Sequence, residues 1–436
     1  MSAAVKSEVS PARSCAFAVL RRVFEHGAYA DRALAAEAAE LSERDRALAM
    51  RMSFGAVQRR ATLDAVLEAL TARSLGRLHP IVLAALRLGL FQLLFMDGIA
   101  EHAAVNESVE LAKPAGVRSA GFTNAVLRRA AREGRELLSG FDDSTPAGAA
   151  VLHSVPLWLA EQWWEELGAP QARALLAYVN EPAESALRVN TLRASAEAVA
   201  AALPVSSRRS PELPEALVLG GPFDLHGSEL WRQGAVMGQS RGSMRVAAEL
   251  APSPGQRLLD LCAAPGAKST HLAALIEDRG EIVAVERHPG RTRALERTCA
   301  RMGAGSIRVQ LGDALVARRD GPFEGVLLDP PCSGLGTLQS RPDLRWRASP
   351  ESIVELAGLQ RRMLEAAATA TAPGATLVYS VCTVSSRETT AVVESFLVDH
   401  GDFELERSLQ LLPHRDRTDG FFVARLKRSS SPKPLP

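Results

Sequence analysis

The second half of the chain alternates short apolar runs with longer amphipathic stretches, and this alternation limits the fold more than any other feature. The apolar runs cover residues 257–261, 281–285, 307–309, 326–328 and 376–379. The segments between them are long enough to form helices. Strands separated by helices are typical of βαβ units and of a parallel sheet. We therefore predict an α/β domain over residues 234–427.

The first part of the chain has helical periodicity instead. Apolar residues recur at three- and four-residue spacing, as in Leu63, Val66, Leu67 and Leu70, which predicts amphipathic helices. The most apolar run, 81–96, is short for a membrane span and is interrupted by polar residues, so it predicts a buried helix. We predict an all-helical domain over residues 11–138 and no membrane association.

Turn-forming and helix-breaking residues between 139 and 156 predict a linker. A small α+β region is expected over residues 156–232, because a Trp-rich helical stretch at 157–167 precedes an extended segment at 186–190. The Ser-, Pro- and Lys-rich residues 428–436 predict a disordered tail.

Composition restricts the partners and the compartment. The chain has 51 basic and 50 acidic side chains and a formal net charge of +1, so binding to nucleic acid would depend on local patches, of which Arg128, Arg129 and Arg132 are one candidate. Five scattered cysteines are typical of a reducing compartment, and we expect a cytoplasmic protein. The histidines and cysteines show no metal-ligand spacing, so no metal site is predicted. A monomer is the working expectation.

A loop of small residues follows the first predicted strand. It reads Cys262, Ala263, Ala264, Pro265, Gly266, Ala267 and Lys268. Small residues before a helix let a ligand approach the backbone and the free N–H groups of the helix. The glycine spacing is neither that of a dinucleotide fingerprint nor that of a phosphate-binding P-loop.

Acidic residues follow the next three predicted strands: Glu286, Asp313 and Asp329. One such acid alone would indicate no more than a surface turn. Together, at the carboxyl ends of neighbouring strands, they predict a ligand site. Carboxylates at the ribose, the adenine and a cationic group suit a charged nucleoside, and S-adenosylmethionine is such a ligand.

Two cysteines also follow predicted strands. Cys332 lies in an Asp-Pro-Pro-Cys sequence that begins at Asp329, and Cys382 follows the run that ends at Tyr379. Two thiols at one sheet edge predict covalent catalysis with a second, proton-handling step. Each cysteine alone could be a small buried hydrophobe, and a disulfide between them is geometrically possible but disfavoured in a reducing compartment. Cys15 and Cys299 lie on predicted helices and are expected to be structural.

At these motifs the chain resembles the RNA cytosine-5 methyltransferases of the Nol1/Nop2/Sun family. The resemblance is carried by the segments 262–268, 329–334, 341–346, 379–383 and 419–426. Two N-terminal segments, 102–107 and 121–128, resemble the NusB-like RNA-binding domain of one subfamily. The chain departs from the family pattern at Ala267, where a second glycine is usual, and at Glu286, where aspartate is common.

The resemblance implies an N-terminal all-α NusB-like domain, an RRM-like α+β middle region and a C-terminal Rossmann-like class I methyltransferase domain. It implies S-adenosylmethionine as methyl donor and small-subunit (16S) ribosomal RNA, not DNA, as substrate. By the same resemblance Cys382 is the nucleophile that adds to C6 of cytosine, and Cys332 assists proton removal and product release. Asp329 is expected beside the methyl donor and the base, and Lys268 beside the thiolate or the carboxylates.

Three alternatives remain open at this point. The same chemistry could act on tRNA or 23S rRNA. The chain could instead be a catalytically inert, NusB-like RNA-binding adaptor, although Cys332, Cys382, Asp329 and Lys268 are all present. Methylation of an exocyclic nitrogen is the third, but in that chemistry an aromatic residue usually stands at the position of Cys332.

Overall fold

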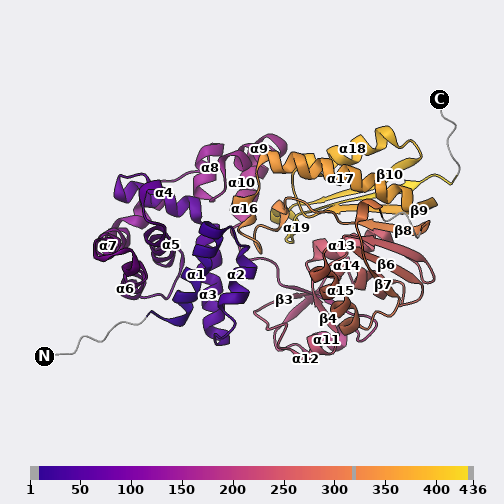
Figure 1. Ribbon diagram of the computed structural model, residues 1–436, viewed down its shortest axis with the longest axis horizontal. Helices are drawn as coiled ribbons and strands as arrows, with labels where there is room; N and C mark the ends of the chain where they lie inside the picture. The colour runs from indigo at the N-terminus through magenta and orange to yellow at the C-terminus, as the bar shows by residue number, and fades with distance from the viewer. Residues whose placement is uncertain (1–8, 317–320, 431–436) are drawn as a thin grey trace. The chain divides into compact units, whose positions relative to one another are not determined.

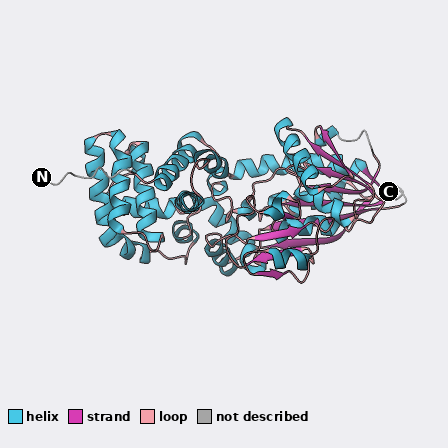
Figure 2. Ribbon diagram, turned by 90° about the horizontal axis from the view of Figure 1, so that it is seen from below, coloured by secondary structure: helices cyan, strands magenta, loops and turns pink. Residues whose placement is uncertain are grey.

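The computed structural model describes residues 9–316 and 321–430, and its contacts divide the chain into two compact units (Figure 1). Unit 1 consists of Met1–Glu181 and Leu338–Arg347, and unit 2 of Pro182–Thr337 and Ala348–Pro436. The strands of the described residues all lie in unit 2, as the secondary-structure colouring of Figure 2 shows. The predicted fold class, helices first and an α/β domain last, is confirmed. The helical unit extends further than the predicted 11–138, however, and includes the helix expected at 157–167 in the middle region.

Unit 1 is helical and is built around one buried helix. Its helices are α1 (Pro11–His26), α2 (Ala30–Glu37), α3 (Glu43–Gln58), α4 (Arg60–Thr71), α5 (Pro80–Phe95), α6 (Glu101–Ala112), α7 (Val117–Ser139), α8 (Pro146–Leu152), α9 (Leu157–Leu167), α10 (Ala169–Tyr178) and α16 (Leu344–Arg347). The predicted buried helix is α5, which is covered on nearly all sides. Its two polar core residues are paired: Arg87 donates two hydrogen bonds of 2.7 Å to Asp64, and Gln92 accepts one of 2.6 Å from Arg13. Pairing offsets part of the cost of burying these groups.

The prediction of a linker over residues 139–156 is wrong for its central residues, Pro146–Leu152, which form helix α8. Thr145 caps this helix by accepting a hydrogen bond of 3.1 Å from the backbone N–H of Gly148, and Pro146 occupies the first turn. Ser, Thr and Pro mark helix starts as well as turns. Residues that we interpreted as breakers therefore begin a helix, and Ala149 and Ala150 are buried by it.

A segment from the second half of the sequence belongs to unit 1. Within Leu338–Arg347, the Arg345 side chain is fully buried and donates hydrogen bonds to the carbonyl of Ser154 (2.9 Å) and to Oδ1 of Asn180 (3.0 Å). Its other acceptors are the carbonyls of Gln58, Val179 and Leu338. The indole of Trp346 donates to the carbonyl of Val57 at 2.7 Å. The Arg-Pro-Asp-Leu-Arg-Trp motif thus has a structural role in the helical unit.

Unit 2 contains a small antiparallel sheet. Its strands are β1 (Ala186–Val189), β2 (Ser207–Arg209), β3 (Ala216–Leu219) and β4 (Val236–Gly238), in the order β2-β3-β1-β4. Two helices, α11 (Ala196–Ala202) and α12 (Glu229–Arg232), complete this region. Its own core includes Leu187, Val189, Val199 and Leu217.

The large sheet of unit 2 has seven strands in the order β10-β11-β9-β8-β5-β6-β7. They are β5 (Arg257–Leu261), β6 (Glu281–Glu286), β7 (Ile307–Leu311), β8 (Phe323–Leu328), β9 (Thr371–Val381), β10 (Phe403–Leu411) and β11 (Phe421–Arg428). The five predicted strands, β5 to β9, are parallel as expected. The antiparallel edge hairpin β10–β11 was not predicted, because exposed Glu and Arg residues of β10 hide its strand pattern.

Helices cover both faces of this sheet (Figure 1). One face packs on α17 (Pro350–Ala370) and α18 (Thr390–Asp399), through residues such as Leu364 and Phe396. The other face packs on α13 (Arg241–Leu250) and α14 (Ala267–Leu275), through Val246 and Leu272 among others. The remaining helices are α15 (Pro289–Met302) and α19 (Pro413–Asp416). Burial on both faces explains why the strands read as continuous apolar runs.

The register of the parallel strands brings their carboxyl ends to one edge. Leu261 pairs with Val285 and with Leu328, and Leu328 pairs with Tyr379. The loops after β5, β6, β8 and β9 therefore start at the same level. In the described residues, no helix is both long and apolar enough to cross a bilayer. Strand β11 continues to Arg428, and residues 431–436 of the predicted tail lie outside the described residues.

Candidate active site

The turn between β5 and α14 is shaped for close approach of a ligand. Gly266 has a φ of 104°, and a Cβ there would lie 2.8 Å from Cδ1 of Leu295, so the position requires glycine. Ala263 and Ala264 are buried in a small cluster with Leu295 and Cys299. Their side chains pack inward, and the backbone of the turn is what remains to face a ligand. Ala267, which replaces a family glycine, is the first residue of α14 and has an ordinary helical position.

The predicted acids lie at the ends of their strands. Glu286 is the last residue of β6, is 2% exposed and accepts a hydrogen bond of 2.9 Å from the backbone N–H of His288. Arg291 lies 3.5 Å from its other oxygen. Asp313 follows β7 and accepts a hydrogen bond of 3.0 Å from the N–H of Leu315. Glu286 thus ends one strand and Asp313 follows the neighbouring one, close to the positions that the sequence predicted.

A further carboxyl group, Asp260, lies under the turn and was not predicted. It is fully buried on β5, and its Oδ2 accepts a hydrogen bond of 2.6 Å from Ser269. Burial raises the pKa of Asp260 to about 7. Within the part of the chain that the structure describes, its Oδ1 has no hydrogen-bond partner. A buried acceptor without a partner leaves room for a donor from a ligand or a water molecule.

Lys268 and Asp329 form an ion pair between two of the loops. Nζ of Lys268 lies 2.7 Å from Oδ2 of Asp329, and the other carboxylate oxygen accepts a hydrogen bond of 3.0 Å from Ser380. The ammonium also lies 5.5 Å from the ring centroid of Phe421. Burial would lower the pKa of Lys268, but the Asp329 charge and hydrogen bond outweigh it, and the nearby Cys382 adds to the rise. Lys268 is thus a fixed cation close to that cysteine.

The two predicted cysteines lie side by side. Their sulfur atoms are 3.3 Å apart, and both side chains are half-buried. The distance fits a hydrogen bond between a thiol and a neighbouring sulfur, and it exceeds the S–S bond length of about 2.05 Å. The hydrogen bond to Cys382 raises the pKa of the Cys332 thiol, with burial as the second cause. The raised pKa keeps the Cys332 thiol protonated.

The other three cysteines are also free. Cys15 and Cys299 are buried on helices α1 and α15. Cys262 packs beside the large core, and burial raises the pKa of its thiol. No three metal-ligating side chains come together in residues 9–316 and 321–430.

The small sheet supports the ligand turn through buried polar side chains. Arg188 of β1 is 1% exposed and donates hydrogen bonds to the carbonyl of Ala267 (2.9 Å) and to Oγ1 of Thr270 (2.8 Å). Nε2 of the buried His271 lies 2.8 Å from the Glu215 carboxylate. Because Nδ1 of His271 has no partner among the described residues, the proton belongs on Nε2. Hydrogen bonds from the small sheet thus fix the first turn of α14.

We expect His271 to make unit 2 less stable in mild acid. Burial lowers its pKa to about 4, below its ordinary value of 6.5. The unfolded chain therefore binds more protons than the folded one between these values, and the free energy of unfolding falls as pH decreases from about 6.5 to about 4, by up to about 3 kcal/mol. Urea unfolding of wild type and His271→Gln over this range tests it. Equal pH slopes for the two proteins would contradict the assignment.

Several residues of this region escaped sequence reasoning. Asp260 lies inside a predicted strand. A carboxylate between leucines in a buried strand could have marked it as a functional residue. Arg188 lies 79 residues before the carbonyl that it holds, so no local pattern points to it. Glu388 stands six positions after Cys382, and no recognised spacing marks it.

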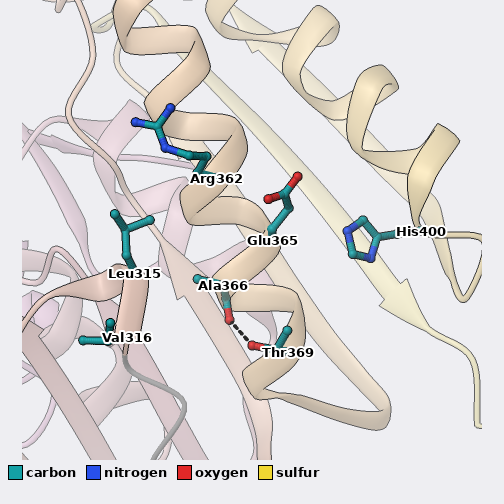
Figure 3. A pocket seen from close by; sticks show the side chains of 7 residues that line it. All are labelled: Leu315, Val316, Arg362, Glu365, Ala366, Thr369 and His400. Carbon is teal, nitrogen blue, oxygen red and sulfur yellow. Dashed lines mark hydrogen bonds between the residues drawn. The ribbon is translucent and has the colours of Figure 1, made fainter.

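A pocket of unit 2 begins next to Asp313, because the backbone N–H of its lining residue Leu315 donates to that carboxylate. It is lined by Leu315, Val316, Arg362, Glu365, Ala366, Thr369 and His400 (Figure 3). The Thr369 hydroxyl donates to the carbonyl of Ala366 within α17. None of the predicted site residues is among the residues that line this pocket.

The fold and this edge of the sheet define a methyltransferase of the Nop2/Sun type with an added helical unit. Family models match along the chain: NusB family at residues 10–132, a RsmF/B-like ferredoxin-like domain at 155–226, and 16S rRNA methyltransferase RsmB/F at 247–427. The chain belongs to the RsmB/F methyltransferase family.

Curated relatives and solved structures agree with this assignment. A Synechocystis protein described as "Probable ribosomal RNA small subunit methyltransferase B" is 36% identical over 96% of this chain and 99% of its own. The Escherichia coli ribosomal RNA small subunit methyltransferase B is 30% identical over 95% and 98%. The crystal structure of PH0851 is 26% identical and covers 97% of this chain and 100% of its own, with a TM-score of 0.82. A methyltransferase homologue from Pyrococcus horikoshii covers 65% and 99% at 25% identity and a TM-score of 0.59.

Proposed function

We propose that the protein methylates C5 of a cytosine in 16S ribosomal RNA, with S-adenosylmethionine as donor and a covalent bond between Cys382 and C6. The observation that carries the proposal is the pair of sulfur atoms 3.3 Å apart beside the Lys268–Asp329 ion pair. The substrate is inferred from the names of the relatives, which specify small-subunit ribosomal RNA. Residues 11–138 and 156–232 are proposed to contribute RNA binding, and 234–427 the chemistry.

The residues of the turn fit S-adenosylmethionine. Gly266 admits a close backbone approach, and Glu286 and Asp313 lie at the ends of neighbouring strands. Oδ1 of Asp260 is a buried acceptor that has no partner among the described residues. We infer that Glu286 holds the ribose, Asp313 the adenine and Asp329 the ammonium group. When bound, S-adenosylmethionine supplies the methyl group that is transferred to carbon.

The two sulfurs suit the two halves of the proposed reaction. C5 of cytosine is a weak nucleophile until a thiolate adds to C6, which makes C4, C5 and C6 enamine-like. Cys382, beside the Lys268 cation and the Cys332 thiol, is suited to be that thiolate. Once Cys382 is bonded to C6, its negative charge no longer opposes ionisation of Cys332. Cys332 can then lose its proton to solvent, and its thiolate accepts the C5 proton. The C5–H electrons form the C5–C6 double bond, and the Cys382–C6 bond breaks to return a thiolate to Cys382.

The nucleoside product tests this proposal. Incubation of the protein with labelled S-adenosylmethionine and unmodified 16S rRNA is expected to give 5-methylcytidine on digestion and chromatography. Cytosine C5, rather than a nitrogen, is expected because thiol addition activates carbon. Exposure of C6 requires an unpaired or flipped base, so a fully paired duplex should be a poor substrate.

Each alternative gives a different result in the same assay. N4-methylcytidine would contradict the covalent mechanism. Methylation of tRNA or 23S rRNA in preference to 16S rRNA would keep the chemistry and change the substrate. RNA binding without any methyl transfer would indicate the adaptor.

A further inference from the structure

A buried carboxylate connects the two cysteine loops of unit 2. Glu388 lies in a short 3-10 turn (Ser386–Glu388) before α18 and is completely buried. Its Oε1 accepts hydrogen bonds from the backbone N–H of Ser333 (2.9 Å) and from Nε2 of Gln360 (3.0 Å). Its Oε2 accepts from the hydroxyls of Ser333 and Thr383, the latter at 3.3 Å.

These contacts reach the residues directly after both cysteines. Ser333 follows Cys332, and Thr383 follows Cys382. The two hydroxyls are also 2.8 Å apart. Gln360 extends the network to the residue before Cys332, because its amide donates to the carbonyl of Pro331 at 2.9 Å. One carboxylate therefore fixes the backbone and side chains next to both sulfur atoms.

The Glu388 carboxylate is held by neutral donors. The structure gives it no ion pair with any of the Lys, Arg or His residues that it describes. The backbone of Glu388 is itself fixed, since its carbonyl accepts a hydrogen bond of 2.7 Å from the buried Tyr379 hydroxyl. Burial of a carboxylate is costly, and four donors offset that cost only while both loops keep this conformation.

We propose that Glu388 is a positioning residue that holds Cys332 and Cys382 at reacting distance from each other. This role rests on the proposed function, because the distance between the two sulfur atoms matters for catalysis only if both cysteines react. Glu388 itself does not touch substrate, because its side chain is buried behind Ser333 and Thr383. Without it, the loops after β8 and β9 lose their common acceptor, and the sulfurs separate.

The test compares Glu388→Ala with Glu388→Gln and with Glu394→Ala, an exposed glutamate on α18 as matched control. Formation of the Cys332–Cys382 disulfide by diamide, which takes up the two hydrogens of the thiols, is followed by peptide mass spectrometry. We expect Glu388→Ala to slow this reaction about tenfold and to lower kcat for methyl transfer about 10²-fold, with KM for S-adenosylmethionine within about twofold of wild type. Glu388→Gln is expected to retain most of both rates, because its carbonyl can replace Oε1 and its amide can donate to the two hydroxyls.

The outcomes separate the two proposals. Wild-type disulfide and methylation rates in Glu388→Ala would overturn the positioning role. Equal impairment of Glu388→Gln and Glu388→Ala would also overturn it. Glutamine keeps the hydrogen bonds but not the charge, so the negative charge of Glu388 would then be what the enzyme requires. If Glu388→Ala does not fold, Thr383→Val removes one contact and must slow disulfide formation for the proposal to stand. If wild type methylates no RNA, the proposed function fails, whereas the disulfide rates still decide the role of Glu388.

Discussion

Replacement of Cys332 by alanine is expected to trap the protein covalently on its RNA, whereas replacement of Cys382 is expected to abolish both adduct and turnover. Cys382→Ala removes the group that activates C5, and loss of a covalent nucleophile costs on the order of 10⁴-fold or more in kcat. Cys332→Ala leaves the nucleophile in place but removes its neighbour 3.3 Å away. Addition then proceeds, and proton removal with release of Cys382 becomes slow.

A denaturing gel of protein incubated with S-adenosylmethionine and 16S rRNA measures the adduct. Cys299→Ala is the control, since this cysteine is buried on α15, away from the pair. An adduct with Cys382→Ala and none with Cys332→Ala would exchange the two roles. Absence of an adduct in both, with active wild type, would exclude a long-lived covalent intermediate.

Lys268→Met is expected to reduce methyl transfer by about 10²-fold. The ammonium lies 2.7 Å from Asp329 in a site where the two side chains are only 13% and 27% exposed. Its loss leaves a partly buried carboxylate without a cation, which is costly. It also removes the positive charge close to Cys382. A cation near a cysteine favours the thiolate, so the rate of the variant should rise at higher pH than that of wild type.

The companion variants Asp329→Asn and the double replacement show whether the two residues act as a pair. If they do, the double variant is little worse than either single one, because contacting residues are not additive. Rates are measured under single-turnover conditions from pH 6 to 9, with thermal unfolding as the check on folding. Fully additive losses and an unshifted pH profile would show that Lys268 acts independently of Asp329 and of the thiolate.

The sequence alone determined the parts of the structure that depend on local patterns. The helix expected at 157–167 is α9 with the same bounds, and the runs expected as strands lie within β5 to β9. Cys332, Cys382, Asp329 and Lys268 could be assigned to one site because parallel strands present their carboxyl ends at one edge. The alternation of apolar runs with helical stretches was enough to predict a parallel sheet, and in a parallel sheet these ends share one edge.

Tertiary structure decided what depends on contacts between distant segments. Arg188 supports Ala267 from 79 positions away, and Arg345 is buried among carbonyls of a helical unit up to 287 positions distant. Glu388 and Ser333 are separated by 55 positions. Buried polar groups must find partners wherever the fold places them, and this requirement has no periodicity in sequence. For that reason the sequence identified the reacting groups, whereas only the folded chain showed what holds them in place.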